Sequence, residues 1–142
     1  MNRGVALLAS ALLAACGSMK VTPARFDQAA LCVERNVGTY PQFLPVLLGE
    51  LRAHGYEPVL VSPGAEANAC PVRMTYVAVR EGDTFLAGAE FRVYRGAEQI
   101  GRGRYSHGGR IQLGPEVTTR GKVGAILDAL LLARVPRIAP SD

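Results

Sequence analysis

The clearest β-strand pattern in the chain lies in the stretch VRMTYVAVREGDTFLAGAEFRVYRGAEQIGRGRY (Val72–Tyr105). Small or apolar side chains alternate with polar ones through three segments, and two turns separate these segments, at Glu81–Asp83 and at Arg95–Gly96. Alternation at every second residue is typical of strands with one buried and one polar face. The stretch therefore predicts three antiparallel strands joined by hairpins.

The residues before this stretch predict a helix between two further strands. Leu31–Arg35 and Tyr56–Ser62 are short, apolar and rich in β-branched residues. Between them, apolar residues recur at helical spacing until the stop signal His54–Gly55. These residues are Phe43, Leu44, Leu47, Leu48 and Leu51. Pro45 falls near the first turn of this helix, where its missing N–H costs little.

A second helix is expected after the hairpins. Thr118 or Thr119 is its predicted cap, Pro136 is its predicted end, and Gly121 and Gly124 favour close contact with the sheet. One apolar stripe runs along it, at Val123, Ile126, Leu127 and Leu130. The elements together predict an α+β fold in which two helices pack on one face of a largely antiparallel, four- to five-stranded sheet, in the order β-α-β-β-β-β-α.

The N-terminal segment has the layout of an export signal. Arg3 precedes an apolar stretch over Val5–Ala15, which is about half the ~20 residues that a transmembrane helix needs. Leu13-Ala14-Ala15-Cys16 resembles the lipobox of bacterial lipoproteins, in which the leader is removed before the cysteine and the cysteine is acylated. The alternative is an ordinary secretory signal with a chance cysteine. By resemblance to Gram-negative lipoprotein sorting, Gly17 implies a lipid anchor in the outer membrane that faces the periplasm.

These signals divide the chain into four parts. Residues 1–15 are the expected lipoprotein signal peptide, 16–28 a lipidated flexible tether, 29–136 a single α+β domain and 137–142 a C-terminal tail. Hydrophobic residues make up 49% of the chain, which favours one globular domain. The net charge of +4 falls by one when Arg3 leaves with the leader, and so modest a charge predicts no particular partner. Export excludes nucleic acid as a partner.

Two cysteines remain after the lipobox cysteine, and export predicts that Cys32 and Cys70 pair. Their bridge would stabilise the fold by about 4 kcal/mol on the chain-entropy model. Strict strand alternation points the two thiols apart, but Pro71 fits the first position of a strand and leaves Cys70 in the preceding loop. The alternative is a metal site that includes His54 and His107, but the chain lacks the close Cys or His pairs typical of such sites. We therefore expect neither a metal nor a cofactor.

The polar face of the predicted hairpins is the candidate binding site. In simple register, Arg73, Arg92, Arg102 and Arg104 lie on one side with Glu90 among them. Guanidinium groups in a row can bind phosphates or carboxylates bidentately, so an anionic glycolipid such as lipopolysaccharide, an anionic glycan or an acidic envelope protein are candidate partners. The alternative is a solvated face with ion pairs to Glu90.

Several features together resemble the Sbal-type family of small Gram-negative lipoproteins. They are the lipobox, the first-strand cysteine, the helix PQFLPVLLGELRAHGYE, the second cysteine just before VRMTYVAV, the hairpin AEFRVYRGAEQIGRGRY and the late helix GKVGAILDALL. The resemblance covers nearly the whole mature chain and implies a shared fold without an assigned activity. Members commonly have an aromatic-rich turn where this chain has Arg80-Glu81-Gly82-Asp83.

No residue set in the sequence specifies a reaction. Ser106-His107 lacks a visible orienting carboxylate nearby, and Gly101-Arg102-Gly103-Arg104 is neither a P-loop nor a dinucleotide-binding motif. We expect a lipid-anchored accessory or interaction module of the cell envelope rather than an enzyme. A binder of an anionic envelope component is the alternative, and a hydrolase is the third hypothesis.

Overall fold

The structure is a computed structural model that describes residues 19–64, 70–82, 85–106 and 118–132. These residues form a mixed six-stranded sheet and two helices. The strand order across the sheet is β1-β6-β5-β4-β2-β3. The elements are β1 (Met19–Thr22), β2 (Ala30–Glu34), α1 (Phe43–Ala53), β3 (Glu57–Val61), β4 (Val72–Glu81), β5 (Phe85–Arg95), β6 (Glu98–Ser106) and α2 (Thr119–Leu130).

The sheet is antiparallel on one side and parallel on the other. Strands β1, β6, β5 and β4 pair antiparallel, whereas β2 pairs parallel with both β3 and β4. The parallel pair follows from α1, which carries the chain back along the sheet between β2 and β3. The α+β class is confirmed, and the expected largely antiparallel sheet of four to five strands is corrected to a mixed sheet of six.

Strand β1 is the element that the sequence analysis did not predict. Met19–Thr22 lies within the segment assigned to a flexible tether, residues 16–28, yet it pairs with β6. The chain stays on the domain after this strand, because the Ala24 N–H donates to the Leu130 carbonyl over 2.9 Å and Ala24 is buried. The domain therefore begins by residue 19, ten residues before the predicted boundary.

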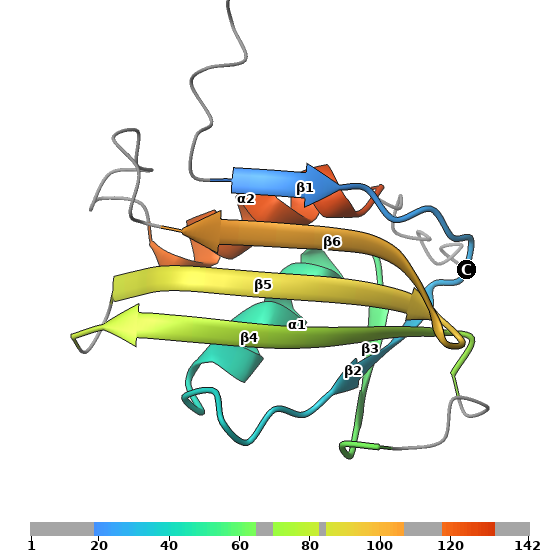
Figure 1. Cartoon of the computed structure of the whole chain (residues 1–142), viewed down its shortest axis with the longest axis horizontal. Helices are drawn as coiled ribbons and strands as arrows, with labels where there is room; N and C mark the ends of the chain where they lie inside the picture. Colours follow the sequence, from blue (N-terminus) through green and yellow to red (C-terminus); the bar gives the residue numbers. More distant parts are fainter. Residues whose placement is uncertain (1–18, 65–69, 83–84, 107–117, 133–142) are drawn as a thin grey trace, which may run out of the picture.

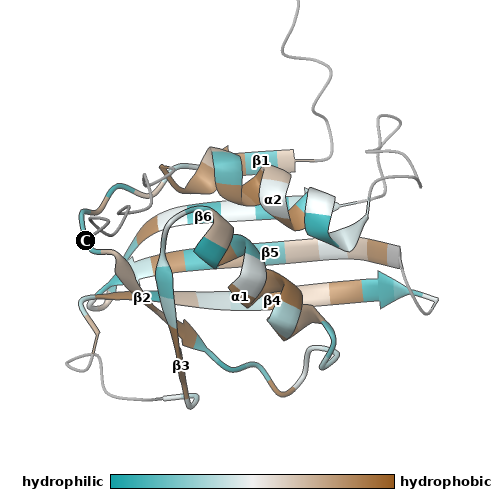
Figure 2. Cartoon of the chain, turned by 180° about the vertical axis from the view of Figure 1, so that it is seen from behind, coloured by the Kyte–Doolittle hydropathy of each residue, from teal (hydrophilic) through white to brown (hydrophobic). Residues whose placement is uncertain are grey.

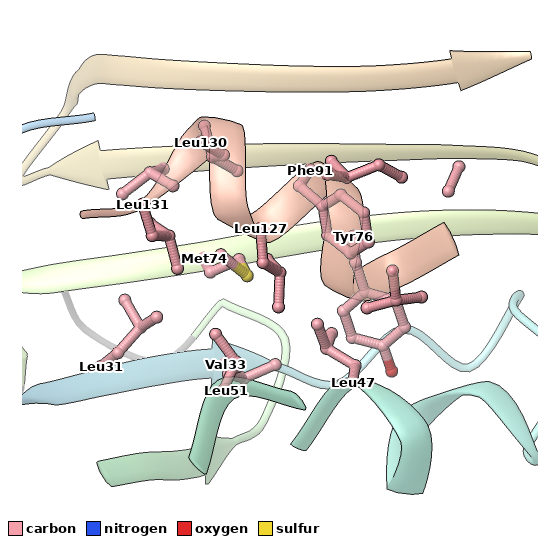
Figure 3. Close-up of a cluster of buried hydrophobic side chains, with 14 of the residues drawn as sticks. Leu31, Val33, Leu47, Leu51, Met74, Tyr76, Phe91, Leu127, Leu130 and Leu131 are labelled. Carbon is pink, nitrogen blue, oxygen red and sulfur yellow. The ribbon is translucent and has the colours of Figure 1, made fainter. Parts of the chain in front are cut away.

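Both helices cover the same face of the sheet, and the other face is open (Figures 1 and 2). Figure 1 looks onto the open face, and Figure 2 looks onto the helices. The side chains that α1 buries are Phe43, Leu47 and Leu51, and those on α2 include Val123, Ile126, Leu127 and Leu130. Figure 3 shows leucines of both helices gathered around Met74, Tyr76 and Phe91 of the sheet. The predicted apolar stripes thus form one core.

The end of α1 and the start of α2 follow local signals, whereas the end of α2 follows a tertiary contact. Helix α1 stops at the predicted His54–Gly55, where Gly55 has a φ of 85°. The Thr118 hydroxyl accepts the Gly121 N–H at the start of α2 over 3.1 Å. The expected end of α2 at Pro136 is wrong, because the helix ends at Leu130. The next residue is extended and pairs with Ala24, so this bridge ends the helix before the proline.

Glycines on β6 allow two other segments to approach the sheet closely. A Cβ on Gly103 would lie 2.9 Å from Ile126 Cγ2, which confirms that this glycine admits a helix. A Cβ on Gly101 would lie 2.5 Å from the Cβ of Ala24, so this glycine admits the segment after β1 instead. Gly124 of α2 faces Glu50 of α1 rather than the sheet, which corrects the expected contact.

A disulfide joins Cys32 to Cys70, whose Cα atoms lie 6.0 Å apart. Cys70 precedes the first residue of β4, as the position of Pro71 predicted. Cys32 lies opposite Arg73 in the parallel pair of β2 and β4, and so it shares the open face with that arginine. The predicted pairing of the two cysteines is present.

Candidate functional site on the open sheet face

The register of the sheet arranges the outward side chains of the open face in transverse rows. Opposite one another in one row are Lys20, Arg104, Glu90 and Val77, which come from β1, β6, β5 and β4. The next row contains Thr22, Arg102, Arg92 and Thr75. Arg73 lies two residues before Thr75 on β4 and faces the same way. The open face therefore carries all four arginines that the alternation predicted.

Three of these arginines surround one carboxylate. Glu90 Oε1 lies 2.6 Å from Arg92 Nε and 3.0 Å from Arg102 Nη2, and Glu90 Oε2 lies 3.6 Å from Arg104 Nε. We call Arg92, Arg102, Arg104 and Glu90 the arginine cluster. Arg92 and Arg102 lie directly opposite each other, where like charges repel, and Glu90 Oε1 contacts both. One carboxylate is thus shared by three guanidinium groups, so the cluster has a net positive charge.

Contacts within the arginine cluster shift the pKa values of Glu90 and Arg92. Burial alone would raise the pKa of Glu90, but hydrogen bonds from Arg92 and Arg102 and their positive charges hold this pKa below its ordinary value. The hydrogen bond to Glu90 in turn raises the pKa of Arg92. The arginine side chains remain 38–57% exposed, so their guanidinium groups can also donate to an anion from solvent.

Arg73 belongs to a separate ion pair. Its Nη1 lies 2.7 Å from Glu34 Oε2, and its guanidinium carbon lies 5.0 Å from the centroid of the Tyr94 ring. Glu34 therefore matches the charge of Arg73 locally. The structure divides the predicted row of four arginines into a cluster of three with excess charge and one arginine with its own partner.

A shallow hollow of about 450 Å³ borders the arginine cluster. Arg92, Arg104 and Glu90 line one part of it, and Val77 and Val79 line another. The two valine side chains are exposed, at 52% and 57%. Gly88 lies opposite Val79 and has no side chain to fill the space between the strands. Charged and apolar side chains therefore line the same hollow.

Sequence reasoning missed two parts of this face. Lys20 lies in the segment that was assigned to the tether, and only the four-residue alternation of Met19–Thr22 signalled its strand. Val77 and Val79 occupy outward positions of β4, where the same alternation that located the arginines could have identified an apolar strip. Neither signal shows that these side chains share one surface until the pairing of β1, β6, β5 and β4 is known.

One basic residue is buried in the helix layer. Lys122 of α2 reaches the Leu86 carbonyl over 3.4 Å, and its Nζ lies 5.7 Å from the centroid of the Tyr105 ring. Burial lowers the pKa of this lysine. Because Lys122 lies on the covered side of the sheet, it does not add to the charge of the open face.

The other candidate residues lie apart from the open face or outside the described residues. His54 Nδ1 lies 2.7 Å from the Glu50 carbonyl, and His54 Nε2 lies 2.6 Å from Asp128 Oδ1, so both ring nitrogens face oxygen atoms of the helices. Within the ranges that the structure describes, no three His, Cys, Asp or Glu residues are grouped so as to hold a metal ion. His107, Cys16, the predicted signal peptide 1–15 and the tail 137–142 fall outside those ranges.

Among the residues with a described placement, no helix is both long and apolar enough to span a membrane. The predicted apolar stretch Val5–Ala15 precedes the first described residue.

The fold and the site together define an open-faced α+β domain with an anion-accessible sheet surface. No protein-family model and no curated protein matches the chain. The fold is similar to that of the PelC dodecamer from Paraburkholderia phytofirmans, at a TM-score of 0.55 and 15% identity, over 80% of this chain and 98% of that one. A variant of the same PelC dodecamer gives a TM-score of 0.54 and 15% identity, over 83% of this chain and all of that one. At this identity the likeness concerns the fold alone.

Proposed function

We propose that this protein is a lipid-anchored interaction module of the cell envelope, with acylated Cys16 in the outer membrane and the domain facing the periplasm. The lipobox and the resemblance to Sbal-type lipoproteins support the anchor. The observation that carries the proposal is the open sheet face, where three guanidinium groups surround one carboxylate and neither of the described helices covers them. Such a surface can hold a partner without any catalytic group.

The structural comparison is compatible with a role in assembly. The PelC structures that share this fold are dodecamers, so the same arrangement of sheet and helices is compatible with extensive contacts between protein chains. The open sheet face and the edge strands β1 and β3 are the surfaces through which this chain would contact a partner.

Mass spectrometry of protein extracted from the membrane fraction tests the anchor. We expect the mature chain to begin at Cys16 and to carry acyl groups there. These groups would hold the protein in the membrane fraction, because each buried methylene adds about 0.8 kcal/mol to membrane binding. The Cys16→Ala protein should remain an unlipidated precursor, whereas Cys32→Ser, a cysteine change outside the lipobox, should be processed normally. An intact leader or a free Cys16 thiol on the mature protein would refute the anchor.

A second candidate function is binding of an anionic envelope component, and the excess positive charge of the arginine cluster favours it. We expect Arg102→Gln with Arg104→Gln to abolish binding of lipopolysaccharide or an anionic glycan in a pulldown from envelope extracts. The melting temperature should change by no more than a few degrees, because exposed ion pairs contribute about 0–1 kcal/mol each.

The matched control is Arg52→Gln with Arg120→Gln, which removes two arginines from the helices. Equal loss of binding in both double variants would show that net charge, not the cluster, is recognised. A stoichiometric protein partner in place of a co-purifying glycolipid would favour the first function over the second.

A further inference from the structure

The distance along the chain between Cys16 and the first strand limits how far the domain can lie from a lipid anchor. Strand β1 begins at Met19, three residues after Cys16. Three extended residues span at most about 10 Å. This inference rests on the proposed acylation of Cys16. With that acylation, the start of β1 lies at the headgroup layer of the bilayer instead of at the end of a long tether.

The start of β1 lies at the end of the sheet that carries the hollow. Met19 is opposite Tyr105, and Lys20 is opposite Arg104. The neighbouring row across β6, β5 and β4 contains Ser106, Gly88 and Val79, all of which line the hollow. The short connection to Cys16 therefore holds this part of the open face close to the lipid.

The chemistry of this part of the face matches an anionic bilayer. Lys20, Arg92, Arg102 and Arg104 bring four positive charges, against which Glu90 supplies one negative charge. Anionic headgroups attract basic side chains at the bilayer surface. Val77 and Val79 add exposed apolar surface beside these charges. A free anion would use only the arginines, whereas a lipid surface can engage both kinds of side chain.

We propose that the open face is a docking surface for anionic phospholipid in the membrane that holds the anchor. The three arginines of the cluster and Lys20 bind the headgroup phosphates. Val77 and Val79 contact the glycerol and upper acyl region. This identifies the anionic component of the second candidate function. It also turns the helix layer, with α1 and α2, away from the membrane (Figure 2), so that a protein partner would contact an edge strand and not the open face that the lipid occupies.

A single introduced tryptophan tests the orientation, because the chain contains no tryptophan of its own. Val79→Trp places the reporter at an exposed position of the open face, and Leu132→Trp places the control at an exposed position after α2. The control lies beside the segment that follows β1, at the end of that strand away from Cys16. The acylated full chain is reconstituted in bilayers with brominated phosphatidylcholine, with or without phosphatidylglycerol.

We expect brominated lipid to quench the Val79→Trp protein in bilayers with phosphatidylglycerol and to leave the Leu132→Trp protein unquenched. Each basic side chain near an anionic surface changes binding about fivefold, so adding Arg102→Gln and Arg104→Gln should lower the ratio of docked to undocked protein about 25-fold. High salt should act in the same direction. Arg52→Gln with Arg120→Gln should leave the quenching unchanged.

The possible failures are distinguishable. Acylated protein without quenching of the Val79→Trp variant would overturn the docking and leave the anchor intact. Equal quenching without phosphatidylglycerol would overturn the role of headgroup charge. Capture of the open face by an acidic envelope protein in place of lipid would also overturn the docking. An unacylated Cys16 would refute the proposed function itself.

Discussion

Glu90 separates two arginines that face each other across strands β5 and β6. At the scale of single residues, we predict that Glu90→Gln lowers the free energy of unfolding at neutral pH by up to about 1 kcal/mol, because Arg92 and Arg102 then repel each other without compensation. The fold should survive, since all three arginines are partly exposed. Urea unfolding of both proteins measures the difference.

The same carboxylate predicts a dependence on pH. The pKa of Glu90 is lowered in the folded state, so its stabilising contribution is complete above the ordinary glutamate pKa of about 4.3 and is lost as the pH falls through the lower folded value. The stability advantage of the natural chain over Glu90→Gln should therefore shrink at acid pH. A constant difference at all pH values would contradict the prediction.

At the scale of elements, a histidine links the two helices. His54 at the end of α1 contacts the Glu50 carbonyl and the Asp128 carboxylate of α2, and both of these oxygens accept hydrogen bonds. We predict that His54→Gln and Asp128→Ala each lower the free energy of unfolding by about 0.5–1.5 kcal/mol, the typical net contribution of one hydrogen bond.

A double-mutant cycle checks this link between α1 and α2. The effects of His54→Gln and Asp128→Ala should fail to add, because each change already removes the shared interaction. Additive effects would mean that the two side chains contribute independently and that the helices are held by their apolar contacts alone.

At the scale of the whole molecule, the disulfide connects the parallel side of the sheet to the hairpins. Cys32 and Cys70 are 38 residues apart in the sequence, and their bridge holds Cys70, two residues before β4, against β2. We predict that Cys32→Ser with Cys70→Ser lowers the free energy of unfolding by about 4 kcal/mol, because the unfolded chain regains loop freedom. Urea unfolding with and without reductant measures the loss, and reductant should leave the double variant unchanged. Peptide maps that show free thiols at both positions would contradict the bridge.

Local patterns in the sequence were sufficient for most elements of the fold. Alternation over Val72–Tyr105 predicted the hairpins, helical spacing predicted α1 and α2, and Thr118 and His54–Gly55 predicted two helix ends. Alternation also placed the arginines on one face. These features were predictable because side-chain periodicity and backbone preference act among neighbouring residues.

The tertiary structure decided what depends on residues far apart in the sequence. Met19–Thr22 is a strand because β6 offers it a partner, and α2 ends at Leu130 because Ala24 binds the next residues. Alternation alone could not show that Arg92, Arg102 and Arg104 share Glu90 while Arg73 pairs with Glu34, since this follows from strand register. A short strand has too few residues to specify its pairing, and register is set only when the whole sheet buries its core face.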